Sequence, residues 1–237
     1  MRSALSFLTV VGGSRRPGPA TLDWFPGVGL LLGLATGGSW WLASRIWPAA
    51  VAAAVAVAVD LALTGLLHFD GVVDTADGLL PPMDRSRRLE VMSKPDAGAF
   101  GVVVAAVMLL LRWTALSAVK PDVLLLAGLW CLSRTIAAAA ARSQPYARAV
   151  AGVPGLADAF AGPARWPVTG LGAAVSVALL MVWRPGPGAA SAAAAIGAAV
   201  LIHALSRRRL GGYTGDVLGA GIVLAETAGL LTAAAQW

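Results

Sequence analysis

The chain is poor in charge and in cysteine. Only 13% of its 237 residues are charged, and Cys131 is the single cysteine. One cysteine excludes a disulfide framework and the paired-cysteine signatures of zinc sites. Because Cys131 lies in an apolar run, we interpret it as a small buried side chain. With so little charge and a mean hydropathy of +0.75, the composition lies outside the range of soluble globular proteins.

Two common ligand-binding loops are also missing. Gly27, Gly29 and Gly33 do not have the spacing of a dinucleotide-binding loop, and we interpret them as helix-packing positions. The aspartates after residue 69 are not spaced by two, as a calcium-binding loop requires. The net charge is +6, but the basic residues separate apolar segments instead of forming a stripe. Membrane topology explains the basic residues better than a nucleic-acid partner does. We therefore predict no nucleic-acid partner.

Long apolar segments are abundant instead. A transmembrane helix needs about 20 mostly apolar residues to cross about 30 Å of hydrocarbon. Seven segments approach this length: residues 27–44, 48–67, 98–118, 122–141, 167–183, 188–205 and 217–236. The sequence therefore predicts an all-α integral membrane protein, with a bundle of about seven transmembrane helices in a single domain over residues 1–237.

The basic residues divide unequally between the two ends of these segments. One end carries only Arg45, Lys120 and Arg184. The other carries thirteen: Arg2, Arg15, Arg16, Arg85, Arg87, Arg88, Lys94, Arg142, Arg148, Arg165, Arg207, Arg208 and Arg209. The positive-inside rule then predicts a cytoplasmic N-terminus and an external C-terminus in the cell inner (plasma) membrane. The polar motifs share the basic side, so we expect an active site that faces the cytoplasm.

An acidic cluster is the most informative motif. Half of the twelve acidic residues lie between Asp70 and Asp96. If the second segment continues as a helix through residue 80, Asp70, Asp74 and Asp77 share one helical face. Crowded carboxylates repel one another unless a cation neutralises them, and magnesium prefers such oxygen ligands. We therefore predict a Mg²⁺ site on these three aspartates. The alternative is that two Asp-Gly pairs mark turns at a helix end.

Other polar residues extend this candidate site. His68 either transfers a proton or caps the helix. Asp216 either joins the acidic cluster or only caps the last helix, and Glu226, in mid-span, is expected to neutralise a buried cation, with Arg134 as the first candidate. The predicted catalytic residues are His68, Asp70, Asp74, Asp77 and Lys94, and the predicted substrate-binding residues are Arg88, Asp96, Arg134, Arg148, Thr214 and Asp216.

Together these residues resemble the cobalamin synthase family, the adenosylcobinamide-GDP ribazoletransferases. The motifs that carry the resemblance are Phe7-Leu-Thr9, Phe25-Pro-Gly-Val-Gly29, His68-Phe-Asp-Gly-Val-Val-Asp-Thr-Ala-Asp-Gly78, Arg88-Leu-Glu-Val-Met92, Lys94, Gly98-Ala-Phe-Gly101, Ser133-Arg134, Tyr146-Ala-Arg148, Gly211-Gly-Tyr-Thr-Gly-Asp-Val-Leu-Gly-Ala220 and Glu226. The resemblance implies that adenosylcobinamide-GDP and α-ribazole, or its 5′-phosphate, are joined with release of GMP. It leaves the oligomeric state open.

Two other functions remain open from the sequence. Asp74-Thr-Ala-Asp-Gly78 is similar to part of the CDP-alcohol phosphotransferase motif, but Leu79-Leu-Pro-Pro82 stands where that motif continues. A cation-coupled transporter is the second alternative. It predicts broken helices in matching halves and acidic residues near the membrane midplane, whereas these acids cluster towards one side and the sequence has no evident internal repeat.

Overall fold

The described part of the chain is helical. The computed structural model describes residues 1–11, 13, 17–150, 160 and 165–237. Its helices are α1 (Arg2–Leu8), a short 3-10 helix η1 (Leu22–Trp24), α2 (Phe25–Ala43), α3 (Ala49–Thr64), α4 (Leu67–Leu79), α5 (Arg85–Val91), α6 (Ala99–Ala118), α7 (Val123–Ser143), α8 (Ala147–Val150), α10 (Trp166–Trp183), α11 (Pro185–Leu210) and α12 (Gly215–Ala233). The predicted all-α fold is confirmed.

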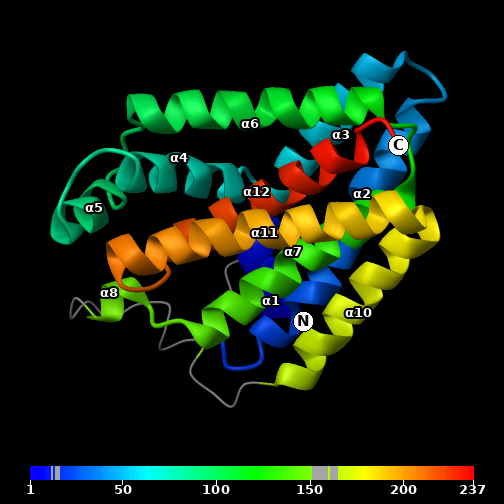
Figure 1. Cartoon of the computed structure of the whole chain (residues 1–237). Helices are drawn as coiled ribbons and strands as arrows, with labels where there is room; N and C mark the ends of the chain where they lie inside the picture. Colours follow the sequence, from blue (N-terminus) through cyan, green and yellow to red (C-terminus); the bar gives the residue numbers. More distant parts are fainter. Residues whose placement is uncertain (12, 14–16, 151–159, 161–164) are drawn as a thin grey trace.

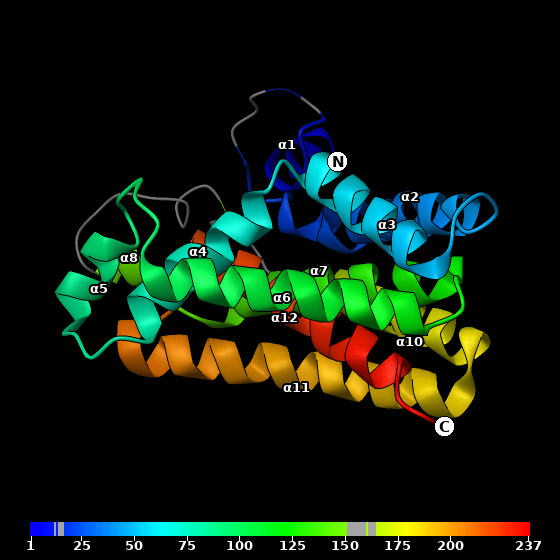
Figure 2. The ribbon, with the colours of Figure 1, turned by 90° about the horizontal axis from the view of Figure 1, so that it is seen from above.

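The long helices run between two ends of the molecule. Figures 1 and 2 both show α6, α11 and α12 extending from the end that holds α5 and α8 towards the end that holds the C-terminus. Helix α7 lies at the centre and packs against α2, α10, α11 and α12. Because its neighbours cover it, Leu125, Leu126 and Leu129 are fully buried.

Five helices are long and apolar enough to cross a membrane: α6, α7, α10, α11 and α12. They confirm five of the seven predicted segments. Residues 27–44 do form a helix, α2, but it is not among the five. Its glycines, with Thr36 and Ser39, lower its hydropathy.

The second predicted segment departs from the sequence prediction. It does not continue as one helix through residue 80, because α3 ends at Thr64 and α4 begins at Leu67, bent by 87°. Gly65 and Leu66 adopt left-handed backbone conformations, with φ of 58° and 64°. Counted as one broken span, α3 and α4 raise the candidate spans to six.

The N-terminal segment covers this break. The backbone N–H of Val10 donates to the Leu63 carbonyl oxygen at 3.0 Å. In hydrocarbon, a carbonyl freed by a broken helix needs a donor from the protein. The stretch after α1 therefore satisfies a polar group that the bend releases.

The unequal distribution of basic residues is also seen in space. The three loops that carry Arg45, Lys120 and Arg184 lie at the end of the bundle that holds the C-terminus (Figures 1 and 2). The opposite end holds α5, α8 and the last turn of α11, which together carry seven arginines. Arg15 and Arg16 lie outside the described residues. Which end is cytoplasmic stays a prediction.

Candidate functional site

The site forms where α4 and α12 meet without intervening side chains. A Cβ atom added to Gly71 would lie 2.6 Å from the carbonyl oxygen of Asp216 and 3.2 Å from its Cα. Gly71 is thus in direct contact with the backbone at the start of α12. Apolar residues on both sides complete the contact, namely Phe69 and Val72 from α4 with Ala220 and Val223 from α12.

This contact gathers carboxylates from two distant parts of the sequence. Asp70 and Asp74 stand on α4, and Asp216 stands in the first turn of α12. Asp70 is exposed, and the other two are half-buried. Of the two alternatives for Asp216, the structure places it beside the acidic cluster, and Thr214 is the cap of α12. The predicted binding role of Asp216 stays a prediction. The described basic residues form one ion pair with these acids, between Arg148 and Asp216 at 3.6 Å.

Thr214 fixes the start of α12. Its hydroxyl oxygen accepts from the Val217 N–H at 3.2 Å and its hydroxyl donates to Asp216 at 3.2 Å. Thr214 is fully buried, so its position is that of a helix cap that orients Asp216. Its predicted contact with substrate stays a prediction.

Replacing Gly71 by alanine is expected to separate α4 from α12. The new methyl group would overlap the Asp216 backbone, which cannot move as a flexible side chain can. Overpacking of this kind costs about 1–3 kcal/mol of unfolding free energy, measurable by chemical denaturation in detergent. Gly197→Ala is the matched control because a Cβ there meets nothing within 4 Å, and a helical Gly→Ala change there should stabilise slightly. Equal stability of the two variants would contradict the contact.

Asp77 has a role that the sequence did not reveal. It is buried, and its two carboxylate oxygens accept from the N–H groups of Gly98 at 2.7 Å and Gly101 at 2.9 Å. These two N–H groups lie at the start of α6, so Asp77, which stands on α4, caps the N-terminus of α6. A Cβ at Gly101 would lie 2.5 Å from the carboxylate. The Gly98-Ala-Phe-Gly101 motif therefore makes room for this cap.

The three-aspartate metal site has no preformed geometry. Within the described ranges, no group of three or more His, Cys, Asp or Glu side chains is able to hold a metal ion. Asp77 already accepts two backbone hydrogen bonds. Asp70, Asp74 and Asp216 still supply the hard oxygen donors that magnesium takes, and magnesium commonly binds through one or two carboxylates together with water and substrate phosphate. The donor chemistry fits the ion, and its binding stays a prediction.

Arg88 closes the far end of α4. It is buried and donates to the carbonyl oxygens of Gly78 at 2.6 Å and Leu79 at 3.0 Å. Arg209 from the end of α11 donates to the same Leu79 carbonyl. The last carbonyls of a helix have no partner within it, so both arginines act as caps here. The predicted contact of Arg88 with substrate stays a prediction.

Lys94 and Asp96 lie on the surface beyond α5. Lys94 forms an ion pair with Glu90 at 3.3 Å, and Asp96 is exposed. Hydrogen bonds from Arg87 and Lys94 hold the pKa of the Glu90 carboxyl below its ordinary value. The structure thus pairs Lys94 with a neighbouring surface acid, and its predicted catalytic role stays a prediction.

Arg148 connects α8 to the site. Besides its ion pair with Asp216, its guanidinium donates to the Met92 carbonyl oxygen at 3.1 Å and to the Ser93 hydroxyl. The segment that carries it pairs with the loop before α12, because the Ala147 N–H donates to the Tyr213 carbonyl oxygen at 2.8 Å. Arg148 is only partly buried, so it is the predicted basic residue that directly borders the carboxylates.

Arg134 lies in the core instead. Fully buried, it forms an ion pair with Glu226, which confirms the predicted partner. The same carboxylate also binds Arg112, and Arg112 binds Asp60 at 2.8 Å. We refer to these four residues as the buried ionic network. Asp60 and Arg112 were missed from the sequence, although a charged residue inside each of two apolar segments was the available signal.

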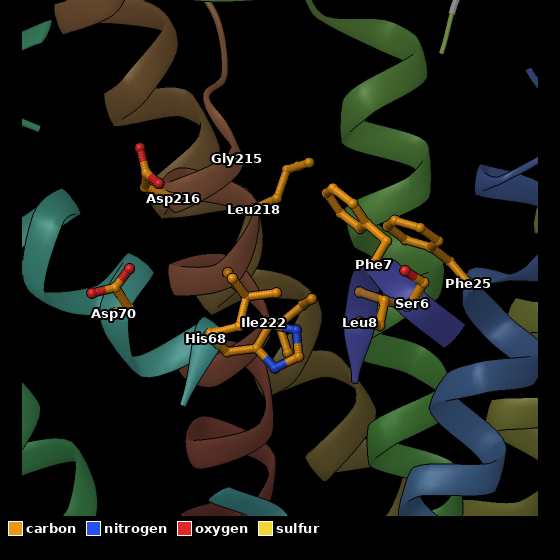
Figure 3. A pocket seen from close by; sticks show the side chains of 12 residues that line it. Ser6, Phe7, Leu8, Phe25, His68, Asp70, Gly215, Asp216, Leu218 and Ile222 are labelled. Carbon is orange, nitrogen blue, oxygen red and sulfur yellow. The ribbon is translucent and has the colours of Figure 1, made fainter. Parts of the chain in front are cut away.

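A pocket of about 360 Å³ adjoins the carboxylates. Figure 3 shows Asp70 and Asp216 on one side of it, Phe7 and Phe25 on the other, and His68 between them. His68 is buried, and its Nε2 has no hydrogen-bond partner among the described residues. The lining residues are Ser6, Phe7, Leu8, Phe25, Leu67, His68, Asp70, Gly215, Asp216, Leu218, Gly219 and Ile222. The α1 and α2 residues of this wall were not among the predicted site residues, although Phe7 and Phe25 belong to the N-terminal motifs of the resemblance.

Comparison with known proteins gives one consistent result. The family model described as cobalamin-5-phosphate synthase matches residues 1–234. An adenosylcobinamide-GDP ribazoletransferase from Chlorobium phaeobacteroides is 37% identical and aligns over 91% of this chain and 88% of its own length. A second adenosylcobinamide-GDP ribazoletransferase, from Ectopseudomonas mendocina, is also 37% identical and aligns over 98% of this chain and 97% of its own length. No solved structure matches significantly.

Proposed function

The chain belongs to the cobalamin-5-phosphate synthase family, and from this we propose that it is a membrane-bound adenosylcobinamide-GDP ribazoletransferase. It transfers the adenosylcobinamide-phosphate group from adenosylcobinamide-GDP to α-ribazole or α-ribazole 5′-phosphate and releases GMP. The structural observation that carries the proposal is that Asp70 and Asp216 line a pocket of small-molecule size and Asp74 lies close enough to interact electrostatically with both.

The reaction exchanges one phosphate ester bond for another. The ribose hydroxyl oxygen of the ribazole attacks the phosphorus that carries the cobinamide group, and a new O–P bond forms. The bond from that phosphorus to the GMP oxygen breaks, and GMP leaves. The hydroxyl proton passes to a base beside the pocket, for which His68 and the carboxylates of Asp70 and Asp216 are the available groups.

The protein residues position the reactants and balance charge. Arg148 is placed to neutralise phosphate oxygens because its guanidinium already borders the Asp216 carboxylate. Asp70 and Asp74, with Asp216 beside them, are the residues that would hold a magnesium ion. When bound, magnesium would polarise the phosphoryl oxygens and stabilise the leaving GMP. Asp77 supports this arrangement by joining α4 to the start of α6.

The membrane position of the site follows from its place in the bundle. Helix α4 and the first turn of α12, which carry the carboxylates, lie towards the end that holds α5, α8 and the last turn of α11 (Figure 1). The seven arginines of these three elements outnumber the basic residues of the loops at the other end. By the positive-inside rule we assign this end to the cytoplasm and the chain to the cell inner membrane. The cytoplasm also supplies nucleotides and magnesium.

The two alternatives have less support. The bend between α3 and α4 is a broken helix of the kind that a transporter uses, but it has no counterpart among the other described helices. The CDP-alcohol phosphotransferase reading rests on one short motif, whereas the family match extends over residues 1–234.

The direct test is GMP release by membranes that contain the protein. We expect release when adenosylcobinamide-GDP and α-ribazole are both added, and almost none when either is omitted. A corrinoid product that contains the ribazole should appear in equal amount. Release without ribazole would indicate a hydrolase. If both substrates give no release and a CDP-alcohol with an acceptor alcohol gives CMP, the proposed reaction is wrong.

A further inference from the structure

The pocket beside the carboxylates has two chemically different ends. Asp70 and Asp216 lie at one end and Phe7 and Phe25 at the other, as Figure 3 shows. His68 separates them. A ligand that fills the pocket therefore has to be apolar at one end and polar at the other.

The apolar end is built largely by the N-terminal part of the chain. Phe7 from α1 stacks on Phe25 from α2, with ring centroids 5.8 Å apart and an interplanar angle of 22°. The ring of Phe160 forms edge-to-face contacts with the rings of both Phe7 and Phe25. Phe25 is buried by these contacts, whereas Phe7 stays half-buried. Leu218 and Ile222 of α12 complete this end.

We infer that the apolar end binds the benzimidazole base of the acceptor nucleoside and that Phe7 determines specificity for it. This inference rests on the proposed function. A benzimidazole is a flat, largely apolar bicyclic ring, which suits offset stacking on an aromatic side chain. The donor's guanine carries several hydrogen-bonding groups along its edge. Burying those groups without partners is costly, and the side chains at this end are apolar except for Ser6, whose hydroxyl donates to the Gly13 carbonyl oxygen.

The size of the pocket agrees with the smaller substrate. Its volume of about 360 Å³ lies near the lower limit of small-molecule pockets, which span about 300–1,000 Å³. A benzimidazole nucleoside is a ligand of that class. A corrinoid bearing a nucleoside diphosphate is much larger, so the donor presents only its diphosphate here, at the carboxylate end.

His68 then meets the sugar of the acceptor. Its side chain lies between the two ends, and the buried Nε2 lacks a partner among the described residues. With the base against Phe7, the ribose passes His68 and offers this nitrogen a hydroxyl group. The reacting hydroxyl reaches the Asp70 and Asp216 end, where the diphosphate is held.

Phe7→Ala is the variant that tests the assignment. We expect the KM for α-ribazole to rise about tenfold because one stacking surface is lost. The KM for adenosylcobinamide-GDP should stay within about twofold. Phe7→Leu keeps the apolar volume without the ring and should give a smaller rise. Phe100→Ala is the matched control, since this exposed side chain of α6 is not among the residues that line the pocket, and both KM values should be unchanged.

Direct binding separates this inference from the proposed function. Equilibrium dialysis of purified protein with radiolabelled α-ribazole, without donor, should show weaker binding to Phe7→Ala than to wild type. If Phe7→Ala raises the KM for the donor alone, guanine occupies the pocket and the inference is wrong. The inference is also wrong if the KM values for both substrates are unchanged. If wild type releases no GMP with both substrates, the proposed function fails, whatever the dialysis shows.

Discussion

Asp74→Asn is expected to lower turnover by a factor on the order of 100 or more, equivalent to about 2.7 kcal/mol of transition-state stabilisation. Asp74 is half-buried on α4, one turn from Asp70, and α4 meets the start of α12. An asparagine has nearly the same size but removes one negative charge from the proposed magnesium ligands. The loss should therefore appear in catalysis and not in folding.

The measurement is the rate of GMP release over a magnesium titration. The variant should require more magnesium than wild type at equal amounts of inserted protein. Asp84→Asn is the matched control. Asp84 is exposed and caps α5 through the Arg87 N–H at 2.9 Å, and asparagine caps a helix about as well. Turnover of Asp74→Asn near that of the control would remove Asp74 from the site.

Glu226→Gln is expected to be the most destabilising conservative substitution in the chain. The Glu226 carboxylate contacts Arg112 through one oxygen and Arg134 through the other, and also accepts from the Ser133 hydroxyl at 2.9 Å. The amide would leave two buried guanidinium groups with Asp60 as their only acidic partner in the network. Removing one member of a buried ion pair costs about 3–5 kcal/mol.

Thermal unfolding in detergent measures this loss, and the midpoint should fall by roughly 10 °C. Glu90→Gln is a matched control because Glu90 also contacts two basic side chains, Arg87 and Lys94, but at the exposed surface. Exposed ion pairs contribute little to stability, so its midpoint should match that of wild type. A stable but inactive Glu226→Gln protein would mean that Glu226 acts in the reaction instead of in the core.

The helices were predictable because their apolar runs are long. Helices α6, α7, α10, α11 and α12 lie where the runs place them. The bend at Gly65 and Leu66 was not predicted, because leucine rarely adopts a left-handed conformation and the apolar run continues through it. Hydropathy reports how apolar a segment is, and it carries no information on the direction of the chain within that segment.

The site was predictable in its residues more than in their roles. Asp70, Asp74 and Asp216 could be proposed from their residue type and their place next to apolar segments. Asp77 shares the helical face that predicted a ligand, yet its carboxylate caps α6, a contact between segments that no local pattern encodes. Arg88 likewise caps α4. The wall formed by Phe7 and Phe25 depends on how α1 folds back onto the bundle, which is again a tertiary contact.

The contact between Gly71 and Asp216 also orders events during biosynthesis. More than half of the chain separates the two residues, and the N-terminal part emerges from the ribosome first. While α4 enters the membrane, its aspartates have no α12 to pack against. The proposed catalytic site is assembled only when α12 has been inserted, so a nascent chain that stops short of α12 lacks Asp216 and the contact that would position α4.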